Sequence, residues 1–136
     1  MVDSSYTESN YALSLDNKNI HIENSSKKLN DIIKNVANKQ NIKYFEGTTL
    51  CNECFDPYIT DIKTMLSRVP KDITISGCEM EAFALFYNAK REGKHASCLL
   101  NVVDSLTDKK SLSSDERQNG LNTMIKLALD SALEIQ

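Results

Sequence analysis

The sequence has no long apolar run and no cluster of basic residues, and each absence argues against a class of function. Its 136 residues carry a formal net charge of −3, whereas proteins that bind nucleic acids or membrane surfaces usually gather Lys and Arg. The unbroken apolar runs are only a few residues long, and no charged and then apolar leader opens the chain. We therefore expect a soluble cytoplasmic protein that binds neither nucleic acid nor membrane.

Cysteine is too scarce to suggest a disulfide scaffold. The chain has four cysteines, which are expected to be reduced thiols in an intracellular protein of this size. Cys51 with Cys54, and His95 with Cys98, form two paired spacings that resemble those of a structural zinc site, which is an alternative. Because His95 and Cys98 are expected in a strand, where residues i and i+3 point to opposite faces, we predict no metal.

The composition suits one globular domain. With 40% hydrophobic and 26% charged residues, the chain can build a single core. Residues 1–10 are polar, rich in Ser and without periodicity, so we predict a flexible N-terminus followed by one domain over residues 11–136.

Periodicity predicts alternating strands and helices. Residues 11–15 and 19–23 alternate as two strands, with a hairpin between them as one option. A helical stripe follows from Leu29 to Ala37, and residues 42–46 read as the next strand. Strand, helix and strand within about thirty residues indicate a crossover between parallel strands.

The second half continues the pattern. A loop is predicted over residues 48–58, a short helix over 58–66, a strand over 72–76, and a helix to residue 91. Residues 95–103 are nearly all apolar, as in a central strand covered on both faces. Ser113 and Glu116 match a capping box that opens the last helix. We predict an α/β fold with a mixed, mostly parallel sheet and helices on both faces.

Two carboxylates, Glu79 and Glu81, lie where a predicted strand meets a predicted helix. An unpaired buried carboxylate costs several kcal/mol (roughly), so something polar should meet them. Ligands of open α/β sheets gather at the carboxyl ends of strands, which favours a substrate with hydroxyl groups. Alternatively, both are solvated residues of the first helical turn.

Three further residues are expected at the same rim of the sheet. Phe55 lies in the loop after one strand, Asp104 ends another, and Arg117 lies in the first turn of the last helix. A guanidinium near Asp104 would stabilise the carboxylate left after that acid donates a proton. Alternatively, Asp104 is a turn residue and Arg117 is solvated.

Three segments together carry a family resemblance. Their order, spacing and residue types are similar, over roughly residues 20–133, to the carboxyl-terminal half of the bacterial-type (hexameric) purine nucleoside phosphorylases of the nucleoside phosphorylase and uridine phosphorylase superfamily. The segments are Glu79-Met80-Glu81-Ala82, Val102-Val103-Asp104, and residues 114–129, which begin Ser-Asp-Glu-Arg-Gln.

The resemblance implies a partial nucleoside phosphorylase fold and a pentosyltransferase of purine salvage. Such an enzyme cleaves a purine (deoxy)ribonucleoside with inorganic phosphate, giving the free base and (deoxy)ribose 1-phosphate. It implies no cofactor besides phosphate as co-substrate. It also implies a homo-oligomer, because members form hexamers built from dimers.

The resemblance also implies roles for the binding residues. Glu81 would hold the ribose hydroxyls, Met80 would pack against the sugar, and Glu79 would support the site. Phe55 is similar to the aromatic residue that stacks on the base.

Asp104 would protonate the purine at N7, and Arg117 would swing towards it to assist. The chain departs from the family where Val103 replaces a usual Ser and where Gly120 interrupts the final helix. The family's amino-terminal half, with its phosphate-binding arginines, has no counterpart. The alternatives are a non-catalytic nucleoside-binding or subunit-pairing remnant, or a nucleosidase that uses water, although the Asp-Glu-Arg-Gln run speaks against the nucleosidase.

Overall fold

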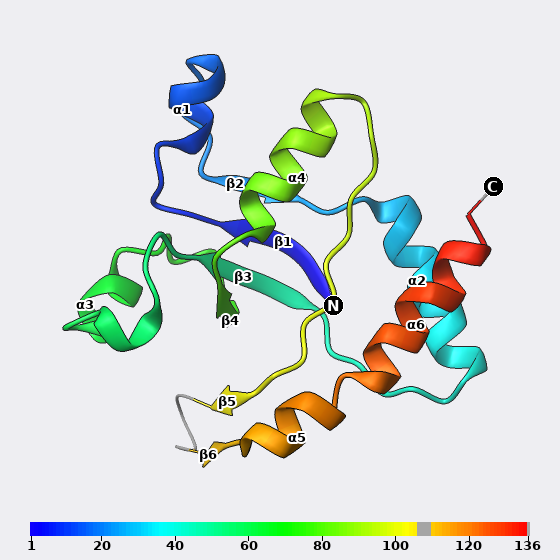
Figure 1. Ribbon diagram of the computed structural model, residues 1–136. Coiled ribbons are helices and arrows are strands. Elements are labelled where there is room, and N and C mark those ends of the chain that lie inside the picture. Colours follow the sequence, from blue (N-terminus) through cyan, green and yellow to red (C-terminus); the bar gives the residue numbers. More distant parts are fainter. Residues whose placement is uncertain (106–109, 136) are drawn as a thin grey trace.

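The computed structural model describes residues 1–105 and 110–135, without the side chains of Asp56 and Asn119. Its centre is a four-stranded sheet in the order β2-β1-β3-β4 (Figure 1). β1, β3 and β4 are parallel, and β2 is antiparallel to β1. The predicted mixed, mostly parallel sheet is therefore confirmed. The strands are β1 (Val2–Tyr6), β2 (Ile22–Asn24), β3 (Gly47–Cys51) and β4 (Ile75–Glu79).

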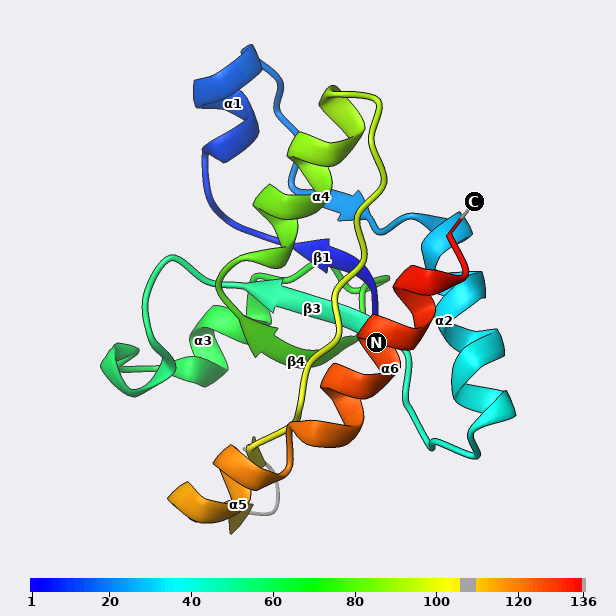
Figure 2. The same cartoon turned by 45° about the vertical axis from the view of Figure 1, so that its right-hand side comes forward.

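Helices cover the sheet and one of its ends. α4 crosses one face, and α2 packs against α6 beside the chain's N-terminus (Figure 2). A separate antiparallel pair, β5 (Asp104–Ser105) with β6 (Lys110–Ser111), precedes α5. The helices are α1 (Tyr11–Asp16), α2 (Lys27–Lys39), the 3-10 turn η1 (Asp56–Tyr58), α3 (Ile62–Ser67), α4 (Ala82–Arg91), α5 (Ser114–Asn119) and α6 (Asn122–Leu133).

The core follows from the alternation of side chains along the strands. Leu50 of β3 packs with Tyr6 and Met65 on the face covered by α3. Cys51, the next residue, packs with Phe83 of α4 on the opposite face. Both faces of the sheet therefore bury large apolar side chains. Each such side chain stabilises the fold by about 1.5–3 kcal/mol when it is fully buried. No helix in the described part of the chain is long and apolar enough to cross a membrane.

Part of the N-terminal stretch, for which the sequence predicted a flexible end over residues 1–10, forms the interior strand β1. β1 lies between β2 and β3, and Val2 and Ser5 are almost completely buried. Its polar side chains are satisfied by neighbouring strands: the hydroxyls of Ser4 and Thr48 lie 2.7 Å apart. A polar segment can therefore form an interior strand when adjacent strands supply hydrogen-bond partners.

The predictions for two early strands were wrong. Residues 11–15 form α1, and so the proposed hairpin does not exist; β2 pairs with β1 instead. In a strand, the first, third and fifth residues of a segment share one face, and in a helix the first and fifth residues do. An apolar alternation over only five residues therefore fits a short helix as well as a strand. Residues 42–46 are not a strand, and Phe45 is 90% exposed; the strand begins at Gly47.

Two later strands also differ from the prediction. β4 runs from Ile75 to Glu79 rather than over residues 72–76. Residues 95–103 form a single antiparallel bridge, between Cys98 and Val2, rather than a central strand. A strand needs a neighbour for its backbone groups, and none of the described residues pairs beside Leu99–Val102.

The helical predictions are largely confirmed. Ser26 caps α2 by accepting from the Leu29 N–H at 3.4 Å. Gly93 follows α4 with φ 63°, a conformation that favours glycine. The Ser113 and Glu116 capping box is present. Gly120 divides the predicted last helix into α5 and α6.

Gly47 is expected to tolerate no side chain. A Cβ there would lie 2.6 Å from the Ser76 Cβ of β4, so Gly47→Ala should lower the free energy of unfolding by about 1–3 kcal/mol. Gly77→Ala is the matched control, because its Cβ would meet nothing within 4 Å. Urea unfolding of both variants tests this, and equal stability of the two would contradict it.

Candidate active site

Glu79 is the last residue of β4 and accepts four hydrogen bonds. Its Oε1 accepts from the hydroxyls of Ser5 at 3.1 Å and Thr49 at 2.8 Å. Its Oε2 accepts from the backbone N–H groups of Glu81 at 2.7 Å and Ala82 at 2.6 Å, at the start of α4. The carboxylate therefore joins β1, β3 and β4 to the amino end of α4.

This geometry distinguishes the two glutamates that the sequence placed together. Glu79 is partly buried and fully engaged, so it is not a solvated first-turn residue. Glu81 is exposed at the N-cap of α4 and caps it with no side-chain hydrogen bond. Among the described residues, its carboxylate accepts only from the Met80 N–H, at 3.2 Å. Met80 is 42% exposed. Glu81 and Met80 thus present free surface at the strand end, held in place by Glu79.

Sequence reasoning missed the partners of Glu79. Ser5 and Thr49 are buried, and their hydroxyl oxygens lie 3.0 Å apart beside the Glu79 carboxylate. They occupy paired register positions on β1 and β3. The alternation of polar with apolar residues in a strand could have indicated Thr49, but nothing in residues 1–10 indicated a buried strand.

Asp104 and Arg117 form an ion pair. Arg117 Nη2 donates to Asp104 Oδ1 at 2.9 Å, and Arg117 Nε donates to the carbonyl of Leu112 at 3.0 Å. Ser111, which the sequence did not indicate, donates its hydroxyl to the same Asp104 oxygen. The side chains of Asp104 and Arg117 are 50% and 45% exposed. The pair is therefore open to solvent and free to meet a ligand.

Arg117 is positioned by the start of its helix. The Ser113 hydroxyl accepts from the Glu116 N–H, and the Glu116 carboxylate accepts from the Ser113 N–H at 2.8 Å. The Ser113 hydroxyl also donates to that carboxylate, at 2.8 Å. The two hydrogen bonds that the carboxylate accepts from Ser113, the backbone one first, lower the pKa of Glu116 below its usual value. The capping box thereby fixes the first turn of α5, from which Arg117 reaches back to β5.

Phe55 lies apart from both groups. Its ring is 59% exposed and meets Tyr58 edge to face, with 5.9 Å between the ring centroids. No hydrogen bond or ion pair within residues 1–105 and 110–135 joins the Glu79 group to the Asp104 pair. The structure thus pairs Glu79 with Glu81 and Asp104 with Arg117, and leaves Phe55 in its own loop.

Cysteines near the site are poor metal ligands and poor nucleophiles. Burial, with the charge of Glu79 adding to it, raises the pKa of the Cys51 and Cys98 thiols to about 11. Within the described residues, no group of three or more His, Cys, Asp or Glu side chains could hold a metal ion. The zinc alternative therefore has no support from the geometry.

The thiol environments predict selective alkylation. At pH 8 a thiol of pKa about 11 is only about 0.1% thiolate, the reactive form, and Cys51 is buried. Iodoacetamide should therefore label the exposed Cys54 at least about tenfold faster than Cys51 or Cys98. Peptide mass spectrometry over time measures the rates, and labelling in denaturant is the control. Equal rates in the folded protein would contradict the prediction.

No family model matches the sequence. Curated relatives do: the chain is 31% identical over 110 residues to the DeoD-type purine nucleoside phosphorylase of Shewanella loihica, covering 79% of this chain and 43% of the relative. It is 34% identical over 100 residues to that of Mycoplasma genitalium, covering 74% and 40%. The chain thus spans less than half the length of these relatives.

A solved structure shares the fold. A futalosine hydrolase mutant of Helicobacter pylori superposes with a TM-score of 0.69 at 19% identity, covering 98% of this chain and 58% of that one. The resemblance that the sequence predicted is confirmed by these relatives. The chain is therefore related to the DeoD-type purine nucleoside phosphorylases over less than half of their length.

Proposed function

We propose that the chain takes part in the phosphorolysis of a purine (deoxy)ribonucleoside, giving the free base and (deoxy)ribose 1-phosphate. The observation that carries the proposal is the solvent-open ion pair of Asp104 and Arg117, held by Ser111 and the capping box. An acid with a guanidinium beside it suits proton donation to a leaving group. The relationship to purine nucleoside phosphorylases supplies the substrate class.

The proposed mechanism begins at the base. Asp104 donates a proton to N7 of the purine, so that the base leaves as a neutral molecule while its bond to the sugar breaks. Arg117, already 2.9 Å from Asp104, stabilises the carboxylate that remains. Phosphate then forms the new bond at the sugar carbon, and its charge offsets the positive charge that develops there.

The sugar is held at the end of β4. Glu81 accepts hydrogen bonds from the ribose hydroxyls, and Met80 packs against the ring. Both are exposed at the strand end, and Glu79 fixes the backbone that carries them. Negative charge at this position also favours the cation-like sugar of the transition state. By relationship, Phe55 is the aromatic side chain that would stack on the base.

Two other functions have specific support. The structural neighbour is a futalosine hydrolase, which favours a nucleosidase, in which water replaces phosphate. The part-length match to the relatives favours a non-catalytic protein that retains nucleoside binding or pairs with other subunits. By relationship we also expect a homo-oligomer, which light scattering of the purified chain would measure.

One assay separates the three functions. The purified chain is incubated with inosine or adenosine, with and without inorganic phosphate, and free base and sugar phosphate are measured. Release of base only with phosphate supports phosphorolysis, and release without phosphate supports the nucleosidase. Binding of the nucleoside by calorimetry with no release supports the non-catalytic protein. Arsenate in place of phosphate is the control, because a phosphorolytic site should accept it.

A further inference from the structure

Ser111 lies directly opposite Asp104 in the small antiparallel pair. The register of β5 and β6 places these two residues face to face. Next to them, the carbonyl of Val103 accepts from the Leu112 N–H at 2.8 Å, which fixes that register. The side chains of directly opposed residues in an antiparallel pair lie on the same face. Strand pairing therefore brings the Ser111 hydroxyl to the Asp104 carboxylate.

Ser111, Arg117 and Asp104 form a closed ring of hydrogen bonds. Arg117 Nη2 donates to Asp104 Oδ1 at 2.9 Å and to Ser111 Oγ at 3.1 Å. Because the Ser111 oxygen accepts from Arg117, its own proton is directed to Asp104 Oδ1. The donation from Arg117 Nε to the Leu112 carbonyl at 3.0 Å fixes the plane of the guanidinium. Asp104 Oδ1 thus accepts from both of its neighbours.

This ring makes the two oxygens of the Asp104 carboxyl group different. Oδ1 accepts from a hydroxyl and from a guanidinium. A proton on Oδ1 would face both of these donors, so the acidic form of Asp104 carries its proton on Oδ2. If the carboxyl group turned over, its proton would point at Arg117 instead of at a substrate. The ring therefore sets the direction in which Asp104 can donate a proton.

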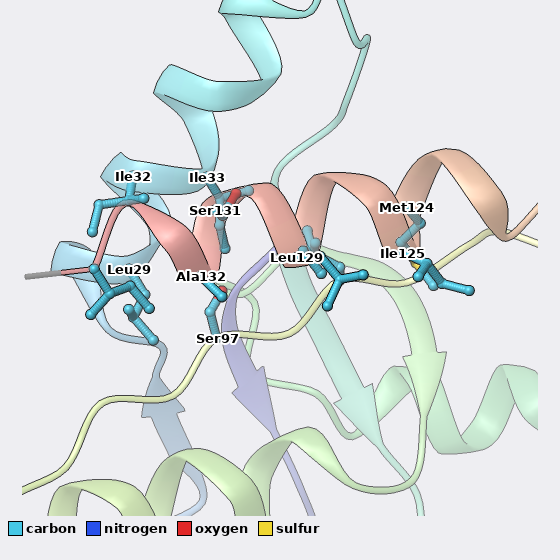
Figure 3. Close-up of a pocket in the computed structure, with 12 residues that line it drawn as sticks. Leu29, Ile32, Ile33, Ser97, Met124, Ile125, Leu129, Ser131 and Ala132 are labelled. Carbon is cyan, nitrogen blue, oxygen red and sulfur yellow. The ribbon is translucent and has the colours of Figure 1, made fainter.

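Packing elsewhere in the second half fixes α6 rather than the acid. Leu127 of α6 packs against Ile33 of α2. Figure 3 shows the cavity of about 410 Å³ that is left between these two helices, and no described residue of β5, β6 or α5 lines it. Those three elements lie apart from the four-stranded sheet (Figure 1). The orientation of Asp104 therefore depends on its own neighbours, Ser111 and Arg117.

We propose that Ser111 is a positioning residue for proton donation by Asp104. The inference rests on the proposed phosphorolysis, in which Asp104 is the acid. In that reaction the proton passes from Oδ2 to N7 of the purine, and the electron pair of the bond between base and sugar goes to the base. Phosphate then forms the new bond to the sugar carbon. Ser111 touches none of the reacting atoms, but with Arg117 it holds Oδ1 so that Oδ2 faces the base.

A leaving-group test separates positioning from a general loss of activity. Inosine needs a proton at N7, whereas 7-methylinosine carries a methyl group there, and its charged base leaves as a neutral molecule without one. We expect Ser111→Ala to lower kcat for inosine about tenfold and to leave KM within about twofold, because only the acid is misdirected. With 7-methylinosine, kcat should stay within about twofold of the parent value. Ser111→Thr keeps the hydroxyl and should restore the inosine rate.

A second readout does not depend on turnover. The Nε–H of Arg117 donates to the Leu112 carbonyl, and its NMR signal is assigned by its loss in Arg117→Lys. Ser111→Ala opens the ring, so this proton should exchange with water at least about threefold faster. Ser111→Thr should restore the parent rate. Ser114→Ala is the matched control and should leave the rate unchanged, because Ser114 is an exposed serine in the first turn of α5.

The two readouts distinguish failure of this proposal from failure of the proposed function. If the parent chain releases no base from either nucleoside, the proposed function fails, and the exchange rates still decide whether Ser111 holds the ring. An unchanged exchange rate in Ser111→Ala would overturn the proposal. Equal losses of kcat with inosine and 7-methylinosine would also overturn it, by showing a structural role alone. Circular dichroism checks that each variant is folded.

Discussion

Asp104→Ala is expected to lower phosphorolysis of inosine and adenosine about 10³-fold, within the usual contribution of a general acid. Without its carboxyl group, the purine must leave as an anion. Stability should fall by less than about 1 kcal/mol, because the ion pair with Arg117 is half exposed. The measurement is the phosphate-dependent rate of base release by the purified variant, compared with that of the parent chain.

Asp115→Ala is the matched control for this variant. Asp115 is an exposed acid in the first turn of α5, two residues before Arg117, so its loss changes the net charge equally. Its rate should stay within about twofold of the parent rate. An Asp104 variant as active as the Asp115 variant would remove Asp104 from the mechanism.

Glu79→Gln is expected to destabilise the fold by about 2–3 kcal/mol, although the two side chains have nearly the same shape. Glu79 meets four donors, two hydroxyls and two backbone N–H groups. A glutamine amide has one acceptor oxygen, and its NH₂ group would face donors at the other position. Urea unfolding of the purified variant measures the loss.

Glu81→Gln separates this structural effect from substrate binding. Glu81 is exposed and accepts one hydrogen bond from the described residues, that of the Met80 N–H, so its variant should lose less than about 0.5 kcal/mol. If Glu81 holds the ribose, however, the same variant should raise the KM for the nucleoside. Equal losses of stability at residues 79 and 81 would contradict the assignment of Glu79 as the supporting residue.

The helices and the junction at Glu79 could be predicted from the sequence because their signals are local. The stripe of α2, the Ser113 capping box and Gly93 each depend on residues within a few positions of one another. The family resemblance was likewise carried by short segments. The placement of Glu79 at the end of a strand, directly before a helix, followed from the same kind of pattern.

The strands could not be predicted so well, because their partners are distant in sequence. β1 is polar, and it is an interior strand only because Thr48 and Thr49 of β3 and Glu79 of β4 accept or share its hydrogen bonds. The apolar residues 99–102 read as a central strand but have no neighbour in the described chain. In both places, the composition of a segment indicates whether it can be buried. Whether it forms a strand depends on which other segment lies beside it in the folded chain.

The amino-acid order alone was enough to indicate α2, α4 and the start of α5, the α/β class, the resemblance to the relatives and a set of acidic candidates, since each rests on neighbours in the chain. Folding was needed to separate those candidates into a buried support, Glu79, and two solvent-open groups, Glu81 and the Asp104–Arg117 pair. The reason is physical: the role of a carboxylate depends on how many donors reach it, and the two hydroxyl donors to Glu79 come from strands that precede it by 30 and 74 residues.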